Sequence, residues 1–194
     1  TQQRYGEGRG ISLEPIALPE EPESAVKKYF SVESWVREAL THPDWGFYAS
    51  GKMQYHKYYS TFPESLSPFY GRMVAQHLFS MWKSMNLKAG ERFSILEPAA
   101  GEMSLARDIL TFARERAGQD EEWNRFYSAL DYRANDLNAN ALAVGVQKNQ
   151  EFEKEGKLFA VPGDALSFLK SFEAAPVNGV VLSNEFFDNL PPHQ

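Results

Sequence analysis

The sequence predicts an α/β fold with a doubly wound, mostly parallel sheet and helices on both faces. Short apolar runs of strand length alternate with amphipathic stretches of helical spacing after Gly90. This alternation is typical of parallel strands joined by right-handed helical crossovers. The first of these runs is followed by a tight turn of small residues and then by a helix start, as in sheets that bind a ligand at their strand ends.

Four short apolar runs are predicted strands, at 93–97, 132–136, 158–161 and 179–183. The segments between them show the period of an amphipathic helix. These helices are predicted at 104–116, 139–153 and 165–172.

The residues before this core predict two further helices. Residues 1–30 are rich in glycine and proline and are predicted to be an extended arm. Ser31 is a plausible N-cap for a short amphipathic helix that ends before His42-Pro43, and an aromatic-rich loop follows. We therefore expect an arm at 1–30, a helical addition at 31–88 and a Rossmann-like core at 89–194.

A second N-terminal helix is predicted to begin at Ser67-Pro68, because proline suits the first helical position. Its apolar face contains Phe69, Met73 and His77. We expect His77 to be a hydrogen-bonded histidine in the core or at its boundary, without a catalytic role.

Composition and charge exclude several classes of function. The net charge is −6 and the pI is about 5.3, and without a basic run this argues against nucleic-acid binding. No apolar stretch approaches the roughly 20 residues that a membrane span requires. The chain has no cysteine, and its four histidines are scattered, so neither disulfides nor a dedicated metal site is expected.

Three segments are predicted to meet at the carboxyl ends of the strands, where open parallel sheets bind ligands. Glu97 and the small residues up to Gly101 follow the first strand, Asp136 ends the second, and Gly163-Asp164 follow the third. An acidic residue such as Asp136 can accept the hydroxyl hydrogens of a ribose, and Asp164 can meet an adenine edge. Alternatively, backbone N–H groups satisfy Glu97, and Asp136 only begins a turn.

The turn after the first strand bears on the type of cofactor. Oxidoreductases that bind a dinucleotide need glycine at three turn positions, because the pyrophosphate lies against the backbone. Only Gly101 is a glycine here. This disfavours a nicotinamide-dependent oxidoreductase and favours S-adenosylmethionine, which has no phosphate.

The segment after the fourth strand is the most distinctive of the chain. It contains Asn184, Glu185 and Asp188 with two phenylalanines between them. Carboxylates at this place could orient or deprotonate a nitrogen nucleophile that accepts a methyl group. The alternative is an ordinary strand-to-helix turn in which Asn184 is the cap and Phe186 or Phe187 enters the core.

This segment resembles the Asn-Glu-(Phe/Leu)-(Phe/Leu)-Asp-Ala-Leu-Pro-Val motif of the MidA-like methyltransferases, at Asn184, Glu185, Asp188, Leu190 and Pro191. That family includes assembly factors of mitochondrial respiratory complex I and bacterial relatives. Two further motifs are similar to those of the family, namely His42-Pro43 with Gly46-Phe47-Tyr48 and Thr61-Phe62-Pro63-Glu64. The family's first-strand motif, Glu-x-Gly-x-Gly-x-Gly, reads Glu97-Pro98-Ala99-Ala100-Gly101-Glu102-Met103 here.

The resemblance implies a Rossmann-like methyltransferase sheet, S-adenosylmethionine as cofactor and a protein nitrogen, typically of arginine, as methyl acceptor. The implied cofactor-binding residues are Thr61, Pro63, Glu64, Glu97, Ala99, Gly101, Asp136 and Asp164. The implied catalytic residues are Asn184, Glu185 and Asp188. A mitochondrial matrix or a bacterial cytoplasm would fit the family.

The departures from the family motif carry expectations of their own. We expect Met103 to face the cofactor pocket and narrow it, and Glu102 to add negative charge near the methionyl carboxylate. A degenerate methyltransferase fold that serves as a scaffold for a protein partner, with the aromatic loop from Trp45 to Tyr59 as its contact surface, is the alternative. A complete methyltransferase sheet has further strands, so we expect this chain to be the N-terminal portion of a longer polypeptide.

Overall fold

The sheet of the computed structural model, which describes residues 31–50 and 61–192, has parallel strands in the order β3-β2-β1-β4. The strands are β1 (Phe93–Pro98), β2 (Leu130–Asp136), β3 (Leu158–Pro162) and β4 (Gly179–Val181). Successive strands step outward from β1 to β3, and β4 then pairs with the other side of β1. The strand order therefore reverses beside β1, which places the topological switch point at its carboxyl end.

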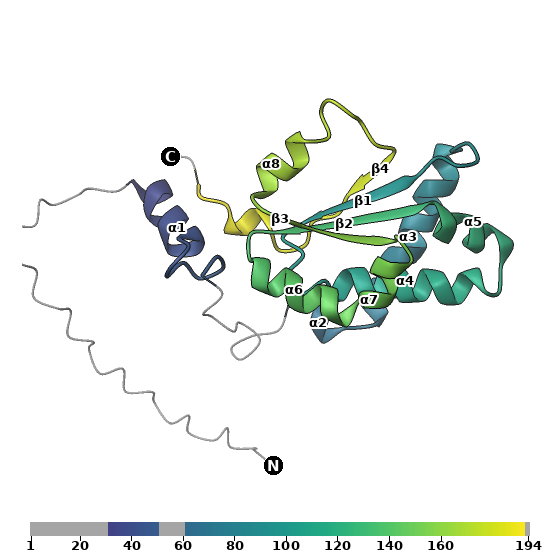
Figure 1. Cartoon of the computed structure of the whole chain (residues 1–194), viewed down its shortest axis with the longest axis horizontal. Coiled ribbons are helices and arrows are strands. Elements are labelled where there is room, and N and C mark those ends of the chain that lie inside the picture. The colour runs from purple at the N-terminus through teal and green to yellow at the C-terminus, as the bar shows by residue number, and fades with distance from the viewer. Residues whose placement is uncertain (1–30, 51–60, 193–194) are drawn as a thin grey trace, which may run out of the picture.

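Helices lie on both faces of this sheet, as predicted. They are α1 (Val32–Thr41), α2 (Phe62–Ser65), α3 (Phe69–Met85), α4 (Ser104–Ala117), α5 (Glu121–Ala129), α6 (Ala139–Lys148), α7 (Gln150–Lys154) and α8 (Ala165–Lys170). A 3-10 turn follows at Phe187–Asn189. Figure 1 shows α8 on one side of the sheet, with α4, α6 and α7 on the other.

The α/β prediction is confirmed, and the strands and helices end close to where the sequence predicts. Local chemistry explains several of these boundaries. Ser31, Asp120, Asn138 and Asp164 each accept a backbone N–H with the side chain at a helix N-terminus, as N-caps do. Residues 1–30 and part of the aromatic loop, 51–60, lie outside the described residues.

The core lies between the sheet and the helices of the larger layer. Phe93, Ile95 and Tyr132 are fully buried there, together with Leu130 and Ile109. Helix α3 belongs to this core rather than to a separate unit, because Ala75 and Leu78 join the same cluster. A Cβ on Gly71 would lie 2.4 Å from the Cβ of Asp108, so this glycine permits the close contact of α3 with α4.

Helix α5 is absent from the prediction. Asp120 caps it. Trp123 turns inward to stack on Phe79 of α3 (ring centroids 4.2 Å apart), and Phe126 meets the same ring edge-on (5.6 Å). A helix of nine residues shows too few apolar turns for a periodic signal, so its burial depends on α3.

Several predicted boundaries differ from the structure. Strand β2 begins at Leu130 rather than Tyr132, and β4 ends at Val181 rather than Ser183. The helix predicted at 139–153 is broken at Asn149, whose side-chain amide donates to the carbonyl of Gly145 (2.7 Å). Side-chain bonds of this kind compete with the helical ladder.

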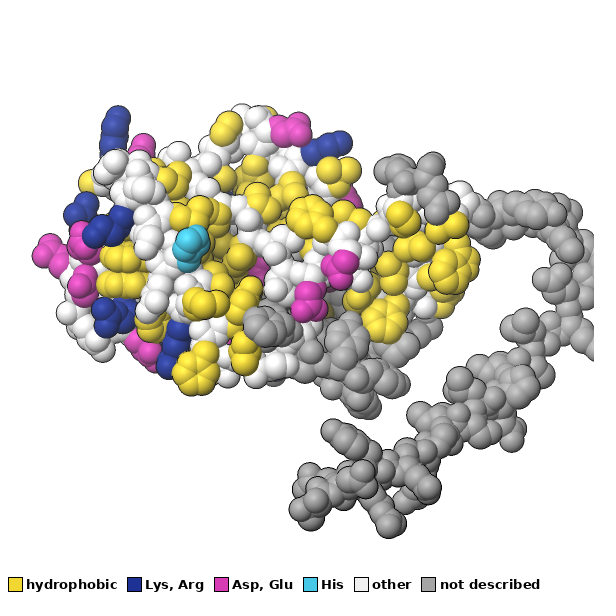
Figure 2. All heavy atoms as spheres, turned by 180° about the vertical axis from the view of Figure 1, so that it is seen from behind, with side chains coloured by type: hydrophobic (Ala, Val, Ile, Leu, Met, Phe, Trp, Pro, Cys, Tyr) yellow, Lys and Arg dark blue, Asp and Glu magenta, His cyan; other side chains and the backbone are white. Residues whose placement is uncertain are grey.

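The expectation for His77 is also wrong, because this residue is exposed. Helix α3 is rotated so that Gly71, Ala75 and Leu78 form its buried side. Phe69 and Met73 therefore lie outward with exposures of 71 % and 60 %. Figure 2 shows hydrophobic side chains gathered on this side of the molecule.

Among the described residues, no helix is both long enough and apolar enough to cross a membrane.

Candidate functional site

The carboxyl ends of β1, β2 and β3 are tied together by hydrogen bonds around Asn135 and Asp136. The backbone N–H of Ala100 donates to the carbonyl of Asn135 (2.9 Å), and that of Gly163 donates to the carbonyl of Asp136 (3.0 Å). The Asn135 side-chain amide donates to the carbonyl of Gly163 (2.9 Å). The three loops that the sequence assigned to a cofactor site therefore meet at one edge of the sheet.

The loop from Ala99 to Met103, called the cofactor loop below, has an unusual backbone. Ala99, Gly101 and Met103 have φ values of 57°, 54° and 58°, in the left-handed region that favours glycine. These are the positions at which the resembled family has glycine. A residue other than glycine costs roughly 1–2 kcal/mol in this conformation, so the loop keeps a glycine geometry with only one glycine.

Met103 does not face the pocket, which corrects the expectation from the sequence. Its side chain is fully buried and lies against α6. A Cβ added at Gly145 would lie 2.6 Å from the Met103 methyl carbon and 2.8 Å from the carbonyl oxygen of Glu102. The space for this methionine is thus provided by a glycine on the facing helix.

The charge of Glu102 is compensated by a residue that sequence analysis missed. Lys148 of α6 forms a salt bridge and hydrogen bond with the Glu102 carboxylate. Glu102 and Lys148 together carry no net charge, so the expected net negative charge near the cofactor is not present.

Asp136 binds the loop that follows β1. One carboxylate oxygen accepts the backbone N–H of Gly101 (2.8 Å), and the other accepts that of Asn138 (2.7 Å). Burial raises the pKa of Asp136, and these backbone hydrogen bonds oppose that rise. The two oxygens of a carboxylate together offer about four lone-pair sites, so Asp136 can still accept a hydroxyl group.

Glu97 is buried at the end of β1, with an exposed fraction of 5 %. Its Oε2 accepts the hydroxyl of Tyr132 on the neighbouring strand (2.8 Å). Burial raises the pKa of Glu97 to about 8; the Tyr132 hydrogen bond lowers it, and the charge of Asp136 raises it further. The partner of Glu97 is thus a tyrosine rather than the backbone N–H groups that the alternative reading of the sequence assumed.

Asp164 lies at the third loop but serves as a cap. Its carboxylate accepts the backbone N–H of Ser167 (2.8 Å) at the start of α8, and this bond is the main cause of its lowered pKa. The residue is exposed.

Thr61 and Glu64 belong to the turn and short helix before α3. The backbone N–H of Thr61 donates to the Glu64 carboxylate (3.3 Å), and α2 contacts α4. The side chain of Pro63 lies outside the described residues. These three residues remain predictions as cofactor ligands.

Residues 184–190, which hold the predicted catalytic residues, are called the acceptor segment below. This segment leaves the sheet beside the cofactor loop, because the N–H of the preceding Leu182 donates to the carbonyl of Leu96 (2.9 Å). Asn184 is half-buried, whereas Glu185 and Asp188 are exposed. Phe187 is 71 % exposed and Phe186 only half-buried. The alternative in which a phenylalanine of this segment enters the core is therefore wrong.

A contact with the N-terminal region holds this segment. The hydroxyl of Tyr48 donates to Oδ1 of Asn189 (2.9 Å), and the Asn189 amide donates to the carbonyl of Glu185 (2.8 Å). Glu185 has a φ of 49°. Neither Tyr48 nor Asn189 was assigned a role from the sequence, since residues 141 positions apart give no local signal.

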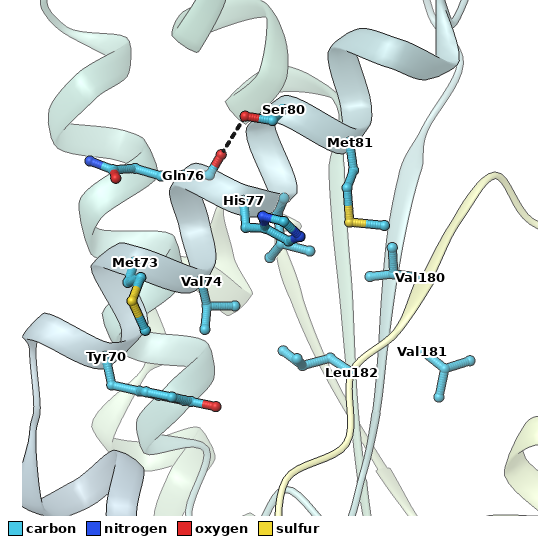
Figure 3. A pocket seen from close by; sticks show the side chains of 11 residues that line it. Tyr70, Met73, Val74, Gln76, His77, Ser80, Met81, Val180, Val181 and Leu182 are labelled. Carbon is cyan, nitrogen blue, oxygen red and sulfur yellow. Dashed lines mark hydrogen bonds between the residues drawn. The ribbon is translucent and has the colours of Figure 1, made fainter.

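The structure also contains a groove of about 630 Å³ between α3 and β4. Figure 3 shows Tyr70, Val74 and Leu182 among the side chains around it. The lining is largely apolar and includes none of the predicted cofactor or acceptor residues. This groove is distinct from the strand ends at which the three loops meet.

Comparisons with known proteins agree with this geometry. Residues 73–194 match the model of a family described as "Putative S-adenosyl-L-methionine-dependent methyltransferase". The chain is 28 % identical over 171 residues to the "Protein arginine methyltransferase NDUFAF7 homolog, mitochondrial" of Drosophila melanogaster, covering 84 % of this chain and 38 % of that protein. The chain thus spans about two fifths of the length of this relative.

A solved structure shares the fold. It is an uncharacterized protein of the COG1565 superfamily from Burkholderia thailandensis, with a TM-score of 0.54 at 18 % identity, covering 84 % of this chain and 36 % of that one. The family model covers more than half of the chain, and its description agrees with the MidA-like motifs of the sequence and with the loops at the strand ends. The chain therefore belongs to the MidA-like family of S-adenosylmethionine-dependent methyltransferases.

Proposed function

We propose that this chain binds S-adenosylmethionine at the carboxyl ends of β1, β2 and β3, as part of an enzyme that methylates a protein nitrogen, in particular that of arginine. The observation that supports cofactor binding most strongly is the backbone of the loop from Ala99 to Met103. Its three positive φ values preserve a turn that brings backbone close to a ligand. Such a strained conformation persists when the surroundings hold it, and it is concentrated at functional sites.

The start of α4 supports the same proposal. Met103 is in the N-cap position and provides no side-chain hydrogen bond to the first turn. The first N–H groups of a helix attract anions, which suits the methionyl carboxylate. Asp136 would accept the ribose hydroxyls, and Glu97 would lie near the methionyl ammonium group.

Acceptor chemistry is assigned to the segment after β4. S-adenosylmethionine supplies an electrophilic methyl group on its sulfonium sulfur. Glu185 and Asp188 carry exposed carboxylates that would orient a guanidinium and receive its proton, and Asn184 would hydrogen-bond it. Arginine as the acceptor is supported by the name of the Drosophila relative.

Partner and location follow from the same assignment. A protein substrate or an assembly partner of the respiratory complex I type would bind near this segment. The mitochondrial relative supports a mitochondrial matrix, and a bacterial cytoplasm is the alternative.

Calorimetric titration of the full-length protein with S-adenosylmethionine and S-adenosylhomocysteine tests the proposal. We expect micromolar binding that Asp136→Ala abolishes and Asp136→Asn weakens. Asp120→Asn, at a carboxylate that caps α5 and is not one of the predicted site residues, is the control and should leave binding unchanged. Absence of binding at millimolar ligand would contradict the proposal.

A second function is the scaffold that binds a protein partner without catalysis. The exposed apolar side chains of α3, including Phe69 and Met73, favour partner binding. The position of Met103 does not favour it, because the methionine side chain is buried against Gly145 of α6. A full-length protein that captures its partner but binds neither form of the cofactor would support this function.

A further inference from the structure

Tyr132 of β2 contacts Glu97, at the carboxyl end of β1, from inside the protein core. Its ring is fully buried in the core, and its hydroxyl donates to Oε2 of Glu97 (2.8 Å). Strand register places Tyr132 opposite Ile95 and Ala134 opposite Glu97, so the tyrosine reaches Glu97 from the sheet interior. In the described part of the chain, no hydrogen bond joins the other carboxyl oxygen, Oε1, to a protein group.

We propose that Tyr132 is a positioning residue of the cofactor site, whose hydroxyl holds Oε2 of Glu97 so that Oε1 receives the ammonium group of the methionyl moiety. The proposal rests on the proposed function, since it assumes S-adenosylmethionine at the ends of β1 and β2. It assigns a binding role to the buried tyrosine, which touches neither the cofactor nor the acceptor.

Proton release follows from this arrangement. Burial raises the pKa of Glu97 to about 8, so the carboxyl group of the free protein is mainly protonated at neutral pH. An ammonium group favours the carboxylate form, and on binding the Glu97 proton passes to the buffer. The O–H bond of Glu97 breaks, and a charge-assisted hydrogen bond to the ammonium replaces it.

Few ionisable groups act on Glu97. Strand β2 contributes Tyr132, whose hydrogen bond lowers the pKa of Glu97, and Asp136, whose charge raises it. The adjacent residues Asp131 and Arg133 pair with each other (3.0 Å) and lie on the opposite face of the sheet, since side chains alternate along a strand.

The other elements packed against β1 add little charge. Strand β4 contains no ionisable side chain. Helix α8 also contacts β1, and its one ionisable side chain, Lys170, is exposed. On α4, Arg107 and Asp108 form an ion pair (3.8 Å), and Asp108 also accepts the hydroxyl of Ser67. Helix α3 brings Ala75 and Leu78 to the shared core. After burial itself, Tyr132 therefore has the largest effect on the pKa of Glu97.

Calorimetry with S-adenosylmethionine on the full-length protein tests the proposal through its pH profile. In two buffers of different ionisation enthalpy, we expect the wild-type protein to release close to one proton per ligand at about pH 7. Tyr132→Phe removes the hydrogen bond that lowers the pKa of Glu97. The rise of affinity with pH should then move to higher pH, with up to about tenfold weaker binding at pH 7 for one unit of pKa and a smaller difference toward pH 8.5.

Tyr127→Phe is the matched control, because the Tyr127 hydroxyl bonds to Glu155 and should not affect the profile. Affinity of Tyr132→Phe that is reduced equally at every pH, or unchanged, would overturn the proposal. If Tyr132→Phe does not fold, the number of protons released on binding is compared between the wild type and Glu97→Gln. Absence of proton release from the wild type would also overturn the proposal. If the wild-type protein does not bind S-adenosylmethionine at all, the proposed function itself is contradicted.

Discussion

Glu97 is a carboxyl group whose buried position makes the stability of the protein depend on pH. Its pKa is raised from 4.5 to about 8, so the folded state binds a proton more tightly than the unfolded state does. The stabilisation from this group is complete below pH 4.5 and is lost as pH rises toward and through 8. The free energy of unfolding falls by up to about 1.4 kcal/mol per pH unit in this window.

Glu97→Gln tests this dependence at the scale of one residue. The amide copies the shape of the protonated acid, so the variant should become more stable relative to the wild type as pH rises from about 5.5 to 8.5. Denaturant unfolding at several pH values measures the effect. Glu115→Gln, at an exposed position of α4, provides the control, and a parallel pH dependence in wild type and Glu97→Gln would refute the buried, protonated state.

Ala99 is a second single-residue test, because its φ is 57°. Ala99→Gly should raise the free energy of unfolding by roughly 0.5–1 kcal/mol, since relief of the left-handed strain exceeds the entropy cost of glycine. The control is Ala100→Gly at the next position, which is outside the positive-φ set and should lose stability. Denaturant unfolding measures both variants, and equal changes in their free energies of unfolding would show that Ala99 is not strained.

At the scale of elements, the cofactor loop and α6 are matched to each other. Met103 fills the space above Gly145, and Lys148 of the same helix pairs with Glu102. The loop therefore retains its backbone geometry through contacts with α6 rather than through three glycines of its own.

Gly145→Ala should disrupt this match. The new Cβ would lie 2.8 Å from the backbone oxygen of Glu102, so the loop must shift, at a cost of about 1–3 kcal/mol. Thermal unfolding and cofactor titration should both show the loss. Gly118→Ala at the end of α4, where the nearest atom is 3.6 Å away, should be nearly neutral, and equal effects of the two changes would argue against the loop contact.

At the scale of the whole molecule, the Tyr48–Asn189 hydrogen bond links the turn after α1 to the acceptor segment. Gly46 makes this possible, because a Cβ there would lie 2.4 Å from the backbone nitrogen of His42. The tight turn directs Tyr48 back toward the end of the chain.

A double-mutant cycle of Tyr48→Phe and Asn189→Ala measures this link. Each change should cost about 0.5–1.5 kcal/mol, and the pair should cost less than their sum because they remove the same hydrogen bond. Unfolding monitored by hydrogen exchange of the acceptor segment gives the readout. Strict additivity would show that the two regions do not interact in solution.

Much of the fold was predictable, because it depends on local patterns. The apolar runs of β1 to β4 and the cap at Ser31 are local signals, and their elements were found. Helix α5 was missed, because its burial depends on Trp123 meeting Phe79 across α3. His77 was misplaced, because periodicity gives the apolar face of a helix but not how much of that face another element covers.

The sequence by itself determined the alternation of the four strands with helices along the chain, the family and the residues at the strand ends, since apolar patterns and motifs are local features of the chain. Only the tertiary structure decided the direction of the Met103 side chain, the Tyr132 partner of Glu97 and the Tyr48 contact with Asn189. Each of these depends on residues that are distant in sequence and close in space. The physical reason is that burial and hydrogen bonding are properties of the packed molecule, whereas helix and strand signals are properties of short segments.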